Sequence, residues 1–165
     1  MNALEAKIEA RRKELLARLD ASKKAKTDRL QANADRLPGI MAQIEALPHA
    51  DLVMARREVR ALPDYLAEDE PILAVGSGQY DRAIWLIVVT DRRVLLLDRG
   101  WFGVKQTDVP LGSISSVAQS LGLLLGSIKI VGSGFAMEID AIRKETVADL
   151  ARSILAARDE AAVPA

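Results

Sequence analysis

The sequence predicts an α+β fold: a seven-stranded antiparallel barrel or sandwich, capped by a C-terminal helix and preceded by an N-terminal helical extension. Three observations predict it. Residues 2–37 contain no Gly or Pro and consist mainly of good helix formers. After Tyr65 the apolar pattern changes from a helical period to short alternating runs, which recur about every ten residues. Residues 142–158 then return to the helical period.

The composition excludes several kinds of site. Half of the 165 residues are apolar, which is enough for a core, and 23 Lys and Arg balance 23 Asp and Glu. There is no cysteine and a single histidine, His49, so disulfides, zinc-thiolate sites, cysteine nucleophiles and multi-histidine metal sites are excluded. We therefore expect no metal and no cofactor. With no partner acid evident, His49 is expected in a surface loop.

The first predicted element is a helix over residues 2–37, which ends at Pro38 and Gly39. Its apolar side chains form two rows spaced by eleven residues, or about three turns, and therefore one nearly straight stripe. At ~50 Å this helix is longer than the ~30 Å diameter of a domain of about 100 residues. It either pairs with another copy as a coiled coil, breaks near residues 22–27, or stays largely solvated. The expected self-association residues are Leu4, Ile8, Leu15, Leu19, Leu30 and Leu37.

Two short helices are predicted next, over residues 39–47 and 51–62, because Leu-Pro pairs divide this segment. Asp51 is the expected N-cap of the second helix. These helices complete an extension of residues 1–62, and a second domain follows over residues 63–160.

The second domain is predicted to contain seven strands and one helix. The residues Asp91-Arg92-Arg93 are expected to form a hairpin turn, and both Gly76-Ser77-Gly78 and Gly132-Ser133-Gly134 are expected to be turns. The helix should bury Val147, Leu150, Ile154 and Leu155. The strands are expected at 71–76, 83–90, 94–98, 104–110, 114–120, 123–131 and 135–140, and the helix at 142–158.

Five short fragments carry a family resemblance over residues 63–157. They are the acidic lead-in Glu68–Leu73, the hairpin Thr90–Leu95, the aromatic turn Trp101–Lys105, the stretch Val109–Val117, and Leu123–Ile130 with Gly126 inside. In this order they resemble the pleckstrin-homology (PH) superfold and, within it, the bacterial PH-like domains of the YokE type. The resemblance implies a PH-like interaction module.

An enzyme is not expected. The sequence has no G-x-S-x-G elbow, no Walker A loop and no H-E-x-x-H motif. Neither Gly-Ser-Gly segment is followed by a helix, so neither is a phosphate-binding loop. Thr90 and Arg93 are interpreted as fold-specifying: Thr90 would bond the turn, and Arg93 would bond carbonyls or an acid such as Asp98.

The distribution of charge along the chain indicates which classes of partner are expected. Residues 1–36 hold ten basic and six acidic side chains, whereas the other 129 hold 13 and 17. The acidic second part disfavours nucleic acid. The PH domains that bind phosphoinositides use a cluster of basic side chains around the first two strands and the loop between them. Here the expected loop 76–82 has one basic residue, Arg82, so a phosphoinositide pocket is not expected. A contact with a partner or a membrane is predicted where aromatic side chains lie beside basic ones, at Arg99, Trp101, Phe102 and Lys105.

The predicted function is therefore a non-enzymatic PH-like interaction and assembly module. It would bind protein partners or itself, as a homo-oligomer, through the helical arm and the barrel. The alternative is a peripheral module that binds an anionic membrane surface, to which bases such as Lys23, Lys24 and Lys26 would contribute. No signal-peptide pattern opens the chain and no apolar run is long enough to span a membrane, so a cytoplasmic protein is expected.

Overall fold

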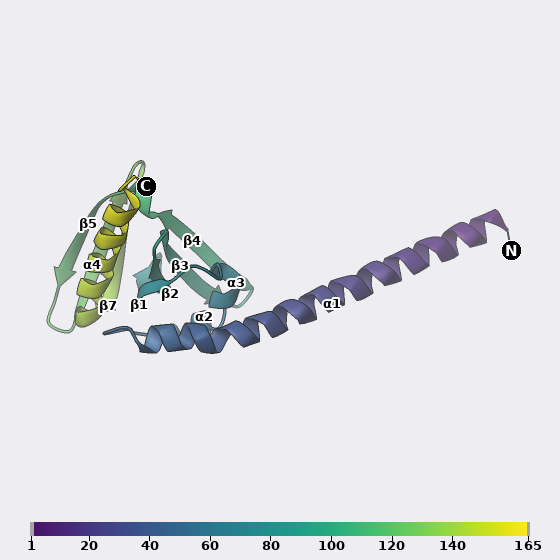
Figure 1. The fold of residues 1–165 in the computed structure, drawn as a ribbon, viewed down its shortest axis with the longest axis horizontal. Helices are drawn as coiled ribbons and strands as arrows, with labels where there is room; N and C mark the ends of the chain where they lie inside the picture. Colours follow the sequence, from purple (N-terminus) through teal and green to yellow (C-terminus); the bar gives the residue numbers. More distant parts are fainter. Residues whose placement is uncertain (1, 165) are drawn as a thin grey trace. The chain divides into compact units, whose positions relative to one another are not determined.

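The computed structural model describes residues 2–164 and divides into two compact units, residues 1–38 and 39–165. The predicted domain boundary at residue 62 stays a prediction. Along the chain the elements, shown in Figure 1, are α1 (Ala3–Glu45), α2 (Arg56–Val59), α3 (Leu62–Tyr65), β1 (Ile72–Tyr80), β2 (Ala83–Thr90), β3 (Arg93–Gly100), β4 (Gly103–Pro110), the 3₁₀ turn η1 (Leu111–Ser113), β5 (Ile114–Leu121), β6 (Leu125–Gly132), β7 (Phe135–Arg143) and α4 (Lys144–Ala161).

The seven strands form one antiparallel sheet in the order β4-β3-β2-β1-β7-β6-β5. The two halves of the sheet are joined where Gln79 of β1 pairs with Asp140 of β7. Strands β4 and β5 are the edges, so the sheet is not closed into a barrel. The predicted seven-stranded antiparallel fold with a C-terminal helix is confirmed.

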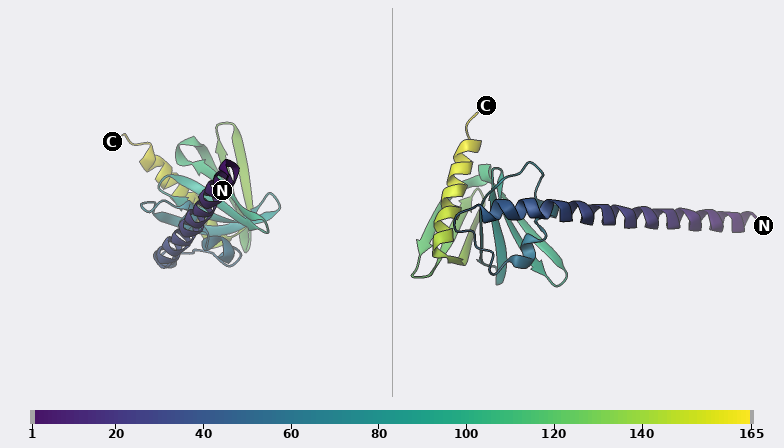
Figure 2. Two further views of the ribbon diagram at one scale, coloured as in Figure 1. Left: turned by 90° about the vertical axis from the view of Figure 1, so that its right-hand side faces the viewer. Right: turned by 60° about the horizontal axis from the view of Figure 1, so that its bottom comes forward.

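Helix α4 packs against β5, β1 and β6, and its yellow ribbon lies along the green strands in Figures 1 and 2. Of the predicted helical face, Leu155 is only partly buried, whereas Val147, Leu150 and Ile154 have no exposed surface. They form one core with side chains from both halves of the sheet, among them Ile87 and Ile139. Burying aliphatic side chains of this size contributes about 1.5–3 kcal/mol each, so α4 is an integral part of this unit.

The opposite face of strands β1–β3 is also covered. Leu86 and Val88 of β2 point away from α4 and pack in a second cluster with Ile44 of α1, Val59 of α2 and neighbouring side chains. A strand that is buried on both faces has no polar alternation. This explains why residues 83–90 read as a continuous apolar run.

The predicted helix end at Pro38 is wrong, because α1 continues through Pro38 to Glu45 and includes most of the predicted helix 39–47. An internal proline costs about 3 kcal/mol, since it removes a backbone hydrogen bond. The burial of Ile40 and Ile44, which are 5% and 2% exposed, offsets that cost.

The predicted helix over residues 51–62 is also wrong. Asp51 does not cap a helix: its Oδ1 accepts a hydrogen bond from the N–H of Val53 at 3.0 Å, and its own N–H donates to the carbonyl of Val75 at 3.3 Å. These bonds hold residue 51 beside β1, and the chain forms only the short helices α2 and α3. Pro63 lies in the first turn of α3, where the lack of an N–H costs little.

The predicted turn at Gly76-Ser77-Gly78 is wrong as well, because all three residues lie inside β1. A Cβ at Gly76 would lie 2.7 Å from Thr146 of α4, and one at Gly78 would lie 2.6 Å from Ile139 of β7. These glycines therefore allow close packing rather than a turn. The actual turn is Asp81–Arg82, where both residues have positive φ, as in a type I′ hairpin.

The predicted turn at Gly132-Ser133-Gly134 is confirmed, with Gly134 at φ +82°. His49 lies in an exposed turn, as predicted, but the expected lack of a partner acid is wrong. Its Nδ1 lies 2.8 Å from Oδ2 of Asp149 on α4, and its carbonyl accepts a hydrogen bond from Thr146 at 2.8 Å. Because its partner is 100 residues away along the chain, local sequence did not reveal this contact.

Candidate functional site

The predicted contact residues Arg99, Trp101, Phe102 and Lys105 lie on one hairpin between β3 and β4. Gly100 pairs with Gly103, which leaves Trp101 and Phe102 as a two-residue loop. Both aromatic side chains are fully exposed, at 98% and 106% relative accessibility. Neither ring is covered by the described residues, so the pair forms an exposed apolar surface.

The two bases of this hairpin do not form one basic patch. Arg99 is opposite Val104, whereas Lys105 is opposite Asp98, so the two bases point to opposite faces of the hairpin. The backbone N–H of Arg99 donates to Glu58 Oε1 at 3.2 Å, and its guanidinium donates to the carbonyl of Arg57 at 3.4 Å. Arg99 therefore fastens the hairpin to α2, whereas Trp101 and Phe102 are left exposed.

A second exposed apolar turn was not predicted. Leu123 and Leu124, between β5 and β6, are 89% and 77% exposed. The turn is tied by hydrogen bonds from Gly122 N–H to the Leu125 carbonyl and from Lys144 N–H to the Leu124 carbonyl. Residues 123 and 124 were predicted to lie in a strand because of their apolar run, but β6 begins at Leu125. The flanking glycines Gly122 and Gly126 were the available signal of a turn.

The predicted self-association residues all lie on α1. Five of them are 53–65% exposed, whereas Leu37 is partly buried. The helix is unbroken at residues 22–27, so of the three alternatives the break there is wrong. Most of the stability of helices in proteins comes from packing of an apolar face, and these residues of α1 leave such a face exposed. The exposed residues are Leu4, Ile8, Leu15, Leu19 and Leu30.

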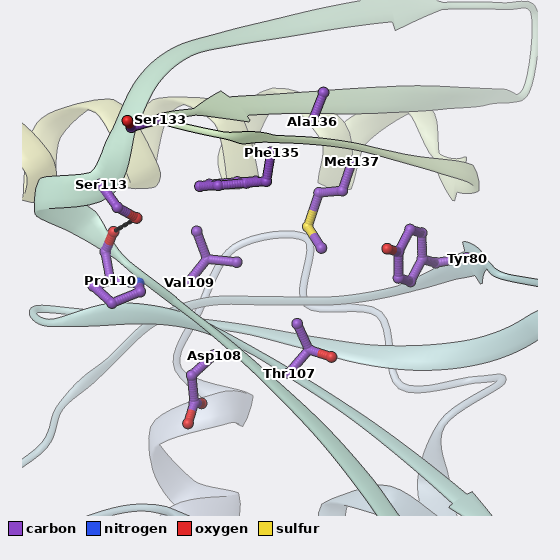
Figure 3. A pocket seen from close by; sticks show the side chains of 10 residues that line it. All are labelled: Tyr80, Thr107, Asp108, Val109, Pro110, Ser113, Ser133, Phe135, Ala136 and Met137. Carbon is purple, nitrogen blue, oxygen red and sulfur yellow. Dashed lines mark hydrogen bonds between the residues drawn. The ribbon is translucent and has the colours of Figure 1, made fainter.

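A cavity of about 440 Å³ lies between β4 and β7. Figure 3 shows the side chains of Val109, Phe135 and Met137 pointing into it, with Tyr80 at one end. Its one lining carboxylate, Asp108, accepts hydrogen bonds from Arg93 and Gln106 at 3.1 and 2.7 Å. The cavity is therefore an apolar space whose only acid already has partners.

The Thr90–Arg93 signature forms a buried ion-pair network. Arg93 donates to both carboxylate oxygens of Glu70 at 2.8 Å and to the carbonyl of Tyr65 at 2.6 Å. The Thr90 hydroxyl accepts from the N–H groups of Arg92 and Arg93 and lies 2.8 Å from Glu70 Oε1. The structural role predicted for Thr90 and Arg93 is confirmed, but the acids are Glu70 and Asp108 rather than Asp98.

Glu70 has a strongly lowered pKa. Burial alone would raise it, but hydrogen bonds from Arg93, the Ala67 N–H and Thr90, together with the charge of Arg93, lower its pKa from the ordinary 4.5 to about 2. The hydrogen bond to Glu70, with the negative charges of Glu70 and Asp108, raises the pKa of Arg93. Glu70 therefore stays ionised and joins the lead-in segment to the β2–β3 hairpin.

A family model described as Bacterial PH domain matches residues 66–155, more than half of the chain. The chain belongs to the bacterial PH domain family. The family resemblance of the five short fragments is thereby confirmed. The match covers every strand of this bacterial PH domain and most of α4, and it includes the Glu70–Arg93 network.

Solved structures give similar matches. A DUF1696 family protein with a pleckstrin-homology domain, from Shewanella loihica PV-4, is 17% identical with a TM-score of 0.43, over 62% of this chain and 95% of that chain. Two structures of p115-RhoGEF linker-DH/PH domains, one N-terminally truncated, are 11% and 13% identical, with TM-scores of 0.44 and 0.42. These matches cover 81% of this chain but only 43% and 42% of those chains. No curated protein matches the sequence significantly.

Two further findings concern the described residues 2–164 of this bacterial PH protein. None of their helices has the length and apolar character that crossing a membrane requires. They also contain no group of three or more His, Cys, Asp or Glu side chains arranged to hold a metal ion.

Proposed function

We propose that this bacterial PH protein is a non-enzymatic interaction module. It would associate with a protein partner or with a second copy of itself through the apolar stripe of α1. PH-like domains generally mediate protein or lipid interactions. The observation that carries the proposal is the exposure of the stripe: Leu15 and Leu19, in its middle, are 53% and 56% exposed. Full burial of one such side chain contributes about 1.5–3 kcal/mol.

A light-scattering experiment tests this association surface. Leu15→Ser and Leu19→Ser together remove two members of the stripe without touching the sheet. We expect the mass of the full chain to rise with concentration, more strongly at about 1 M than at 0.1 M salt, because salt screens the basic side chains of α1. The double variant should remain monomeric at both. Equal masses for parent and variant under all conditions would refute the proposal.

The aromatic hairpin supports a second candidate, contact with a membrane surface. Trp101 and Phe102 are fully exposed, whereas the only other tryptophan, Trp85, is 5% exposed. Interfacial tryptophans change their fluorescence when they enter a lipid headgroup layer. We expect anionic vesicles to shift the emission to shorter wavelength, and Trp101→Ser to abolish that shift. An unshifted spectrum at saturating vesicle concentration would exclude this contact.

A further inference from the structure

The first unit contains an internal eleven-residue repeat that extends beyond its apolar rows. The repeats begin at Leu4, Leu15 and Lys26. In each repeat the fourth residue is basic, the fifth is aliphatic and the seventh is alanine, and in the first two repeats the ninth residue is also basic. The basic rows are Lys7, Arg18 and Arg29 at the fourth position, and Arg12 and Lys23 at the ninth.

These basic rows border the apolar stripe on both sides. At about 100° per residue, the first row lies about 80° to one side of the stripe, and Arg12 and Lys23 lie about 60° to the other. All of these side chains are exposed. Lysine and arginine at such a boundary can lay their aliphatic stems on the apolar surface and direct their charges outward.

The acids of α1 lie mostly away from this boundary. Glu9 and Asp20, at the sixth position of their repeats, lie about 120° from the stripe, and Asp28 and Asp35 lie farther still. Glu14 reaches across to Arg18, 2.6 Å away, at an exposed pair. Glu5 is the one acid at the boundary, about 80° from the stripe, and its carboxylate accepts a hydrogen bond from the N–H of Asn2 at 2.9 Å. The side that presents the leucines is therefore predominantly basic.

At low ionic strength, where its basic side chains are not screened, a second copy of α1 is a poor electrostatic match for this side. In a parallel pair in register, Lys26, which occupies a leucine position of the stripe, would face its own copy across an apolar seam. In an antiparallel pair, the row of Lys7, Arg18 and Arg29 would face the same row of the other copy. Like charges at such positions destabilise a helix pair.

An anionic bilayer matches the whole surface. It accepts apolar side chains and offers phosphates on both sides of a helix lying in its plane, along all ~50 Å of the repeats. A nucleic acid would neutralise the bases but leave the leucines in water. We propose that α1 binds in the plane of an anionic membrane surface, with its leucines in the acyl boundary and Lys7, Arg12, Arg18 and Lys23 at the phosphates. This inference rests on the proposed function, since it names the partner of the same stripe.

The test compares two double variants that remove equal charge at almost the same heights along the helix. Arg12→Gln with Lys23→Gln neutralises the boundary row, whereas Lys13→Gln with Lys24→Gln neutralises the adjacent residues, which lie about 155° from the stripe. All four side chains are exposed, so neither variant disturbs the core. Binding of the full chain is measured by co-sedimentation with vesicles of phosphatidylcholine alone or mixed with phosphatidylglycerol.

We expect binding to the mixed vesicles only. Removing one boundary base should weaken binding to an anionic leaflet about fivefold. The boundary variant, which lacks two of them, should therefore bind about 25-fold more weakly than the parent at about 0.1 M salt. The far-side bases are about 10 Å farther from the lipid, which is one Debye length, and their loss should cost only about threefold. Leu15→Ser with Leu19→Ser should abolish binding.

Four results would overturn the inference. Equal weakening by the boundary and far-side variants would show unspecific charge attraction rather than an oriented helix. Equal binding to neutral and anionic vesicles would remove the role of the bases. No vesicle binding, with a mass that still depends on Leu15 and Leu19, would overturn the membrane inference and leave the association surface standing. If neither mass nor vesicle binding depends on these leucines, both proposals fail.

Discussion

Replacing Glu70 by Gln should remove a large part of the acid sensitivity of the second unit. Glu70 receives two hydrogen bonds from Arg93 and has a folded-state pKa of about 2, below its ordinary 4.5. A carboxyl whose pKa is lowered by folding stabilises the protein above its unfolded pKa. That contribution is lost as the pH falls through the folded pKa.

The expected magnitude follows from this shift. One pKa unit corresponds to about 1.4 kcal/mol, so ionised Glu70 contributes about 3 kcal/mol to the free energy of unfolding. The contribution is complete above about pH 5 and decreases progressively towards pH 2. Other carboxyls titrate in the same range, but the difference between the parent and Glu70→Gln isolates the part that belongs to Glu70.

Urea denaturation at a series of pH values between 7 and about 2.5 measures this difference. The parent should lose up to about 3 kcal/mol relative to Glu70→Gln as the pH falls. If that variant is too unstable to fold, Thr90→Ala, which removes one bond to Glu70, should show a smaller reduction of the same kind. Asp108→Asn is the matched control, because Asp108 is 37% exposed and contacts the same arginine. Parallel pH curves for the parent and Glu70→Gln would refute this account of the network.

Three further substitutions test the packing of the second unit, each by urea denaturation. Leu150→Ala should destabilise it by about 2–5 kcal/mol, because Leu150 is fully buried between α4 and the sheet, and a change within 0.5 kcal/mol would mean that α4 is not docked. Gly78→Ala should cost about 1–3 kcal/mol, since its Cβ would lie 2.6 Å from Ile139 and 2.7 Å from Ile142, and full stability would contradict the close approach of β1 and β7. Ser77→Ala should stabilise by about 1 kcal/mol, because the buried Ser77 hydroxyl has no hydrogen-bond partner among the described residues, and a loss of stability would reveal one.

The role of the glycines of β1 could not be predicted from the sequence. Gly76-Ser77-Gly78 has the composition of a turn, and a turn was predicted, but the glycines are needed because α4 and β7 approach the strand there. Gly132-Ser133-Gly134 has the same composition and is a turn. The difference depends on which side chains arrive from elsewhere in the chain.

Some of the candidate contact surfaces could be predicted from the sequence, and others could not. The apolar rows of α1 and the aromatic pair Trp101–Phe102 were found from sequence, because spacing and residue type identify them. The exposure of Leu123 and Leu124 was missed, since an apolar run by itself does not distinguish a buried strand from an exposed turn. The pairs Glu70–Arg93 and His49–Asp149 join residues 23 and 100 positions apart and required the fold.

The sequence by itself determined the local elements: the α+β class, the seven strands, the closing helix and the repeat of α1. These follow from periodicity, which acts within a few residues. Only the tertiary structure decided that α1 continues through Pro38, that the sheet stays open, and that the apolar run of β2 is covered on both faces. Each of these depends on long-range burial, whose free energy exceeds the local preference of a proline or a glycine.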